Sequence, residues 1–157
     1  MYLSENHDRQ RALDVVRASS SLPFVSKIVE VDGIPMLDGG IADSIPVQHA
    51  IDMGWQHNVV VLTRNKGWRV MGKDHKIPYL YKNYPRLRVA LSHRHRAYNE
   101  QIQLVDDLEA AGKITCIRPI RPLEVGRIEK DTDKLERLYE EGFMLGEAFC
   151  EKCVEKE

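Results

Sequence analysis

The chain has 157 residues, of which 43% are hydrophobic and 30% are charged, and its formal net charge at pH 7 is -1. This length fits one domain with a substantial core, and the composition excludes an intrinsically disordered chain. The near-neutral charge gives no general attraction to nucleic acid, so we expect no nucleic-acid partner.

Cysteine usage and the lack of long apolar runs indicate the cellular compartment of the protein. The three cysteines, Cys116, Cys150 and Cys153, have no spacing typical of a disulfide framework, which favours a reducing environment. The polar N-terminus and the lack of an apolar run long enough to cross a bilayer predict neither a signal peptide nor a membrane span. We therefore expect a cytoplasmic protein, with at most a peripheral contact to a membrane.

Charge is distributed unevenly along the chain. Between Arg64 and Arg96 there are ten Lys or Arg residues and one acid, Asp74, whereas residues 129–157 hold ten acids and five bases. The two segments are interpreted either as solvated faces of opposite sign or, for the basic stretch 64–96, as a surface that approaches anionic lipid head groups.

The N-terminal part predicts a helix followed by a hairpin. Residues 12–18 favour a short helix that ends before a run of serines. The alternating segment Lys27–Val31 predicts a strand, Asp32-Gly33 a hairpin turn, and 34–37 the returning strand. This second strand leads directly into Asp38.

The middle of the chain has the pattern of an α/β fold. Pro46 starts a predicted helix that ends at Gly54. The β-branched run 58–63 is typical of a strand that is buried on both faces of a sheet. A helix between two such strands predicts the α/β class.

Two long helices are expected in the C-terminal part, with one short strand between them. Apolar residues recur every three or four positions from Arg86, and Gly112 is placed to end that helix. Residues 114–117 predict the strand. Asp133 and Glu136 have the spacing of a capping box at the start of the last helix.

Asp38, Gly39 and Gly40 form the main candidate site. As a tripeptide, Asp-Gly-Gly is ordinary turn chemistry, because glycine admits positive φ and aspartate caps locally. Its place after a strand suggests more, since ligand sites in α/β sheets gather at the carboxyl ends of strands. Two residues without side chains would also let a substrate approach the backbone.

The segments around Asp38 resemble the patatin-like phospholipase family. The resemblance rests on RASSSLPF at 17–24 and LDGGIADSIPV at 37–47, followed by AIDMGW and NVVVLTR, and it continues more loosely toward a bacterial branch of the family. It implies the C-terminal part of a three-layer α/β/α domain with two long C-terminal helices. We expect residues 1–157 to form a single partial domain, with a patatin-like region at 12–64 and a helical region with one short strand at 86–157.

This resemblance implies a serine acyl hydrolase with a Ser-Asp dyad, no cofactor and no metal. Asp38 matches the catalytic aspartate, which acts directly on the serine, and Gly39 and Gly40 match the active-site turn. The serine should lie in a Gly-x-Ser-x-Gly elbow, and no such motif occurs in these 157 residues. We therefore expect the serine on a preceding N-terminal half, a lipid or other acyl ester as substrate, and no activity from this chain alone.

The sequence leaves two alternative interpretations open and adds one structural expectation. The chain could be a non-catalytic interaction module that docks on an acidic or membrane surface through residues 64–96. The motif His93-Arg94-His95 could mark a metal or anion site, although packing or surface roles are commoner. If a covering segment is missing, an apolar edge or face should be exposed and should drive homo-oligomer formation.

Overall fold

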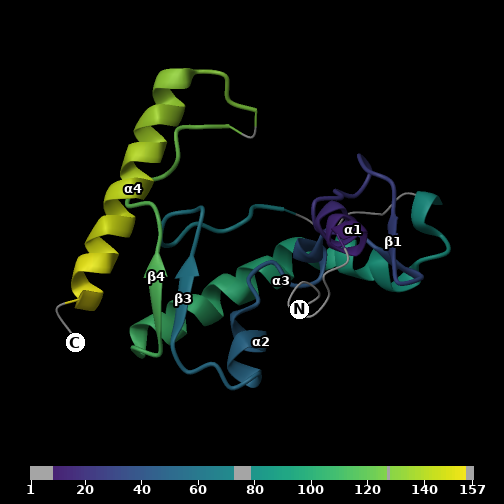
Figure 1. Ribbon diagram of the computed structural model, residues 1–157, viewed down its shortest axis with the longest axis horizontal. Helices are drawn as coiled ribbons and strands as arrows, with labels where there is room; N and C mark the ends of the chain where they lie inside the picture. Colours follow the sequence, from purple (N-terminus) through teal and green to yellow (C-terminus); the bar gives the residue numbers. More distant parts are fainter. Residues whose placement is uncertain (1–8, 73–78, 127, 155–157) are drawn as a thin grey trace. The chain divides into compact units, whose positions relative to one another are not determined.

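The computed structural model describes residues 9–72, 79–126 and 128–154. It is a mixed α/β structure whose chain divides into two compact units (Figure 1). The first comprises Met1–Ile45 and Gly72–Tyr98, and the second Pro46–Met71 and Asn99–Glu157. Residues 73–78, part of the predicted basic stretch, lie outside the described residues. Of the helices described, none is both long enough and apolar enough to cross a membrane.

The first unit is built around a helix and a hairpin. Its elements are α1 (Arg9–Ser19), β1 (Val29–Val31), β2 (Ile34–Met36), the short 3-10 helices η1 (Gly39–Ile41) and η2 (Tyr79–Tyr81), and the beginning of α3 (Pro85–Ala110). Strands β1 and β2 pair antiparallel, and the two turn residues Asp32 and Gly33 have φ values of 53° and 76°. Two consecutive positive φ values are typical of a tight hairpin turn, so this prediction is confirmed.

The core of this unit lies where α1 packs on β1 (Figure 1). Ala18, Val29 and Val31 are buried there, and Val15 and Met36 pack against them. Each fully buried valine contributes about 1.5–3 kcal/mol relative to an exposed one. The apolar positions of α1 thus serve to hold the hairpin, whose second strand leads to Asp38.

Tyr81 fixes the chain at Phe24. The Phe24 backbone has a φ of 68°, which is unfavourable for a bulky residue. Its N–H donates a 2.9 Å hydrogen bond to the hydroxyl of the buried Tyr81, and the two ring centroids are 5.4 Å apart. These contacts offset the strain and connect η2 to the loop after α1.

The second unit contains the β-α-β part of the fold. Its elements are α2 (Val47–Asp52), β3 (Asn58–Val61), the end of α3, β4 (Ile114–Ile117) and α4 (Thr132–Val154). β3 and β4 pair in parallel, with Asn58 opposite Ile114 and Val61 opposite Ile117. Figure 1 shows the two strands side by side with α4 next to β4. Within the described ranges the strands form two separate two-stranded sheets.

Glycines end two of the helices, as the sequence predicts. Gly54 after α2 has a φ of 89°, and Gly112 after α3 has a φ of 67°. The N–H of Gly112 donates to Glu109 and that of Lys113 to Leu108, which satisfies carbonyls of the last turn. Both positions require the left-handed backbone that glycine adopts without a steric penalty.

The predicted capping box at the start of α4 is wrong. The helix begins at Thr132, and the residue that caps it is Asp131. Its Oδ1 accepts hydrogen bonds from the N–H groups of Asp133 at 3.1 Å and Lys134 at 3.3 Å. Asp131 thus has the capping role that the prediction assigned to Asp133. Asp133 lies inside the first turn, where the helix dipole stabilises its negative charge.

The prediction that residues 58–63 are buried on both faces of a sheet is also wrong for this chain. Side chains of β3 alternate between half-buried and exposed, and Val59 and Val61 are 49% and 71% exposed. The reason is that the sheet has only two strands in the described residues, with one face of β3 left open. Leu62, directly after the strand, is buried.

Candidate functional site

Asp38 lies two residues after β2 and caps η1. Its carboxylate Oδ1 accepts a 2.7 Å hydrogen bond from the N–H of Gly40, and its own N–H donates to the carbonyl oxygen of Ser21 at 3.0 Å. The residue is half-buried. No described residue bonds to the other carboxylate oxygen, Oδ2. One oxygen is therefore fixed by the backbone, while the other has no partner among the described residues.

The two glycines of the site have different roles, and neither depends on positive φ. A methyl group on Gly39 would meet no atom within 4 Å, so this position leaves open space beside Asp38. A methyl group on Gly40 would lie 3.0 Å from Oδ1 of Asp38 and 3.7 Å from Nη2 of Arg94. A side chain at position 40 would thus crowd the Asp38 carboxylate, whereas the sequence suggested backbone freedom.

Arg94 and Ser44 complete the turn by binding the carbonyl oxygen of Gly40. The Ser44 hydroxyl donates at 2.6 Å, and Arg94 Nε of α3 donates at 3.1 Å. No ion pair joins Arg94 to the Asp38 carboxylate. Sequence reasoning missed this role of Arg94, because 54 residues separate it from Gly40 and no local pattern connects them.

The serines before the hairpin act in the local structure. Ser21 is buried, and its hydroxyl donates to the Arg17 carbonyl at 2.7 Å. Ser20 donates to the Val16 carbonyl at 2.9 Å. Both hydroxyls satisfy carbonyl groups at the end of α1, which is a common use of serine at helix ends. Ser21 also supports Asp38 through its own carbonyl oxygen.

The histidines beside Arg94 do not gather into a metal site. In the ranges that the structure describes, no three metal-ligating side chains come together. His95 packs with its ring close to Gly72, where a methyl group would meet His95 Cβ at 3.4 Å. Arg94, the middle residue of His93-Arg94-His95, contacts the candidate site through the carbonyl oxygen of Gly40.

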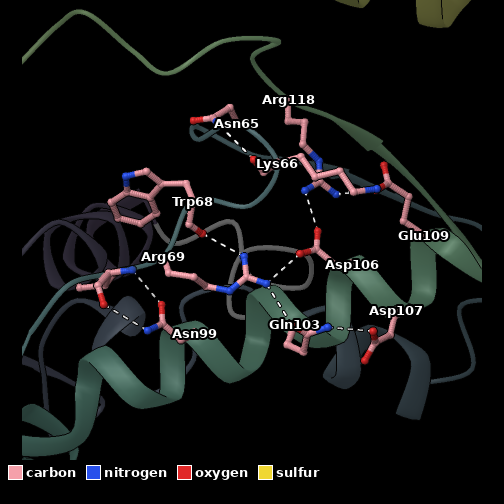
Figure 2. A network of polar contacts seen from close by, with 11 residues as sticks. Asn65, Lys66, Trp68, Arg69, Asn99, Gln103, Asp106, Asp107, Glu109 and Arg118 are labelled. Atoms are coloured by element: carbon pink, nitrogen blue, oxygen red, sulfur yellow. Dashed lines mark hydrogen bonds and ion pairs between the residues drawn. The ribbon is translucent and has the colours of Figure 1, made fainter.

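A second polar cluster lies in the other unit and uses part of the basic stretch (Figure 2). Arg118 is only 9% exposed and donates to Asp106 and Glu109, each at 2.8 Å. Arg69 also binds Asp106, at 3.0 Å, and Lys66 binds Glu109 at 3.1 Å. Both acids belong to α3, so Lys66 and Arg69 of the basic stretch pair with acids of this helix.

Asp106 is held as a carboxylate by this cluster. Burial raises the pKa of Asp106, but hydrogen bonds from Arg118 and Arg69 outweigh burial and keep its pKa below the usual value. Burial likewise raises the pKa of the neighbouring Cys116 thiol. The cluster fastens the loop after β3 and the end of β4 to α3, which is a structural role.

The same unit has an apolar cavity of about 230 Å³ at the carboxyl ends of β3 and β4. Most of its walls are aliphatic, and Gly142 of α4 leaves it open, since a methyl group there would meet no atom. The lining residues are Val61, Leu62, Thr63, Ile117, Arg118, Pro119, Leu123, Leu138, Glu141, Gly142 and Leu145. Asp38 belongs to the first unit, whereas this cavity lies in the second unit and is not part of the candidate site.

Comparisons with known proteins match two separate segments of the chain. Residues 3–51 match the patatin-like phospholipase family, and residues 84–155 match a domain of unknown function, DUF6363. The Escherichia coli (strain K12) protein named "Uncharacterized protein YjjU" is 30% identical over 151 residues, which is 90% of this chain and 41% of that protein. The chain thus spans about two fifths of this curated relative. No solved structure gives a significant match. The comparisons therefore support the patatin-like phospholipase family for the segment that contains Asp38, Gly39 and Gly40.

Proposed function

We propose that this chain is the C-terminal part of a patatin-like serine acyl hydrolase that cleaves lipid acyl esters with a Ser-Asp dyad. Asp38 is the base, and the serine comes from a segment outside these 157 residues. In this proposal the chain contributes to a three-layer α/β/α domain that the longer protein completes. The family match over residues 3–51 and the greater length of the relative support this assignment.

One observation carries the proposal. The Asp38 carboxylate is fixed through Oδ1 by the N–H of Gly40, and no described residue occupies Oδ2. A base must be held in place and must keep one lone pair accessible. Gly39 has open space around it, which leaves room for a serine hydroxyl and an acyl group to approach.

The reaction proceeds in two steps. The serine Oγ attacks the acyl carbonyl carbon while Asp38 takes the hydroxyl proton, and the alcohol leaves with that proton. Water then attacks the acyl-serine and gives a proton to Asp38, which passes it to the departing serine Oγ as the carboxylic acid leaves. General-base catalysis of this kind contributes about 10²- to 10⁴-fold in rate. Neither a metal nor a cofactor takes part.

The experiment is ester hydrolysis by the longer protein, followed with a short p-nitrophenyl ester. Asp38→Asn keeps the size of the side chain but removes its basicity, so we expect kcat to fall by about 10²-fold or more. Asp52→Asn is the control, because Asp52 is exposed and its side chain accepts a 2.7 Å hydrogen bond from Gln48, away from the candidate site. The 157-residue chain alone should show no turnover. Normal turnover by Asp38→Asn would sink the assignment.

The alternative is a non-catalytic module that docks on an acidic or membrane surface through the basic stretch 64–96. Internal pairing weakens it, because Lys66 and Arg69 are bound to acids and Arg64 lies 4.8 Å from the Trp68 ring centroid. Salt-sensitive cosedimentation of the chain with phosphatidylserine vesicles, but not with neutral vesicles, would favour this module. A cytoplasmic location with peripheral membrane contact is compatible with either function and stays a proposal.

A further inference from the structure

Gly40 is hydrogen-bonded at both of its backbone polar groups, and each bond involves a different side chain. Its N–H donates to Oδ1 of Asp38 at 2.7 Å. Its carbonyl oxygen accepts from Ser44 Oγ at 2.6 Å and from Arg94 Nε at 3.1 Å. The orientation of the Asp38 carboxylate therefore depends on where Gly40 is held.

Only one of these restraints comes from a distant part of the chain. The bonds of Gly40 with Asp38 and Ser44 are local and join it only to residues of its own turn. Arg94 lies on α3, a helix of 26 residues, and so connects the turn to a rigid element. Its bond is charge-assisted, and such bonds are roughly twice as strong as neutral ones.

Arg94 reaches the turn without neutralising the carboxylate. Nη2 of Arg94 and Oδ1 of Asp38 lie 3.7 Å and 3.0 Å from the point that a Gly40 methyl group would occupy. The two side chains approach this point, yet the structure records no ion pair between them. A direct ion pair would occupy the lone pairs that a base needs, whereas a bond to the Gly40 carbonyl leaves them available.

We propose that Arg94 is a positioning residue for Asp38, which it orients by holding the Gly40 carbonyl. This inference rests on the proposed function, in which Asp38 is the base. It also gives a role to the first turns of the segment that matches DUF6363, since Arg94 lies within residues 84–155 while Gly40 lies within the patatin-like match. The region of unknown function thereby helps to build the active site.

The first test uses amide hydrogen exchange of the 157-residue chain, measured by NMR. Arg94→Gln removes the charge-assisted bond, so the Gly40 N–H should exchange about tenfold faster, as expected for the loss of one hydrogen bond. Arg94→Lys keeps a donor within reach and should restore part of the protection. Arg86→Gln is the matched control: it removes the same charge from the same helix at an exposed residue with no contact to the turn.

The second test measures ester hydrolysis by the longer protein with one neutral and one anionic ester. Arg94→Gln should lower kcat about tenfold for both esters with KM unchanged, and Arg94→Lys should recover part of that loss. Arg86→Gln should match the unmodified protein. A loss confined to KM of the anionic ester would mean that Arg94 binds substrate, which overturns the positioning role.

The two tests separate this inference from the proposed function. If Gly40 exchange or kcat is the same in Arg94→Gln as in Arg86→Gln, the positioning role is wrong even when Asp38→Asn is inactive. If Asp38→Asn retains full turnover, the dyad is wrong, and a positioning role in catalysis is overturned with it. Gly40 exchange then still reports whether Arg94 holds the turn.

Discussion

The N–H of Asp38 donates a hydrogen bond of 3.0 Å to the carbonyl oxygen of Ser21, which lies two residues beyond the end of α1. This bond joins the serine-rich segment to the end of the hairpin. Ser21 is itself fixed, because its hydroxyl donates to the Arg17 carbonyl. The position of the candidate base is therefore set by the end of α1 as well as by its own turn.

Ser21→Ala should destabilise the chain more than Ser20→Ala. Ser21 is 5% exposed, and removing its hydroxyl leaves the Arg17 carbonyl with only the longer 3.2 Å bond from Ser20 among the bonds of these two side chains, which costs about 1 kcal/mol. Ser20 is exposed, so water can replace its bond. Urea denaturation of both variants gives the free energies of unfolding. Equal losses would contradict the structural role of Ser21.

Gly40→Ala should impair activity far more than Gly39→Ala. The methyl group on Gly40 must displace Oδ1 of Asp38, whereas the one on Gly39 meets nothing within 4 Å. Because a carboxylate moves more easily than backbone, we expect Gly40→Ala to lose only about 1 kcal/mol of stability. The loss of kcat in the longer protein should be much larger. If Gly39→Ala lost ester hydrolysis while Gly40→Ala kept it, this assignment would be refuted.

Asp106→Ala should destabilise the second unit by about 2–3 kcal/mol, because two arginines lose a charged hydrogen-bond partner. Asp107→Ala is the control, since Asp107 is exposed and its carboxylate accepts from the neutral side chain of Gln103. Chemical denaturation at pH 7 measures the free energy of unfolding of both variants. A similar effect of both substitutions would show that the cluster contributes little.

The lowered pKa of Asp106 also predicts that the stability of the chain depends on pH. Its pKa is lowered in the folded chain, so its contribution is fully present above the unfolded pKa of about 3.9. That contribution is lost as the pH falls through the lower, folded pKa. The difference in unfolding free energy between the unmodified chain and Asp106→Ala should therefore shrink below about pH 4. A difference that stays constant down to pH 2 would exclude this explanation.

Iodoacetamide should modify Cys150 well before Cys116. Cys150 is exposed on α4, whereas Cys116 of β4 is partly buried and has a raised thiol pKa, which lowers its thiolate fraction near neutral pH. Mass spectrometry of tryptic peptides distinguishes them, because they lie in different peptides. Faster labelling of Cys116 in the folded chain would show that β4 is more accessible than the structure indicates.

The open face of β3 predicts self-association of the isolated chain. Val59 and Val61 point to the same side of the strand and are 49% and 71% exposed. Replacing both with lysine should shift the chain toward a monomer, because a charged strand resists association. Light scattering after size exclusion measures the mass. A monomeric unmodified chain would contradict the predicted homo-oligomer.

Local sequence was sufficient for the turn and the helix ends that need positive φ, although it misplaced the cap of α4. The hairpin turn at Asp32-Gly33 and the helix ends at Gly54 and Gly112 need positive φ, which only a few residue types adopt readily. The position of Asp38 after a strand follows from the alternation before it. These features involve neighbours within a few residues, so the pattern in the sequence contains them.

The tertiary structure alone decided how Asp38 is held. Arg94 meets Gly40 across 54 residues, and the need for glycine at position 40 comes from the Asp38 carboxylate and not from φ. The exposure of Val61 likewise depends on how many strands flank β3. Such contacts arise when distant segments pack together, and no local propensity encodes which side chains then meet. Asp38 is thus a candidate base from its neighbours in sequence, whereas the residues that hold it are found only among its neighbours in space.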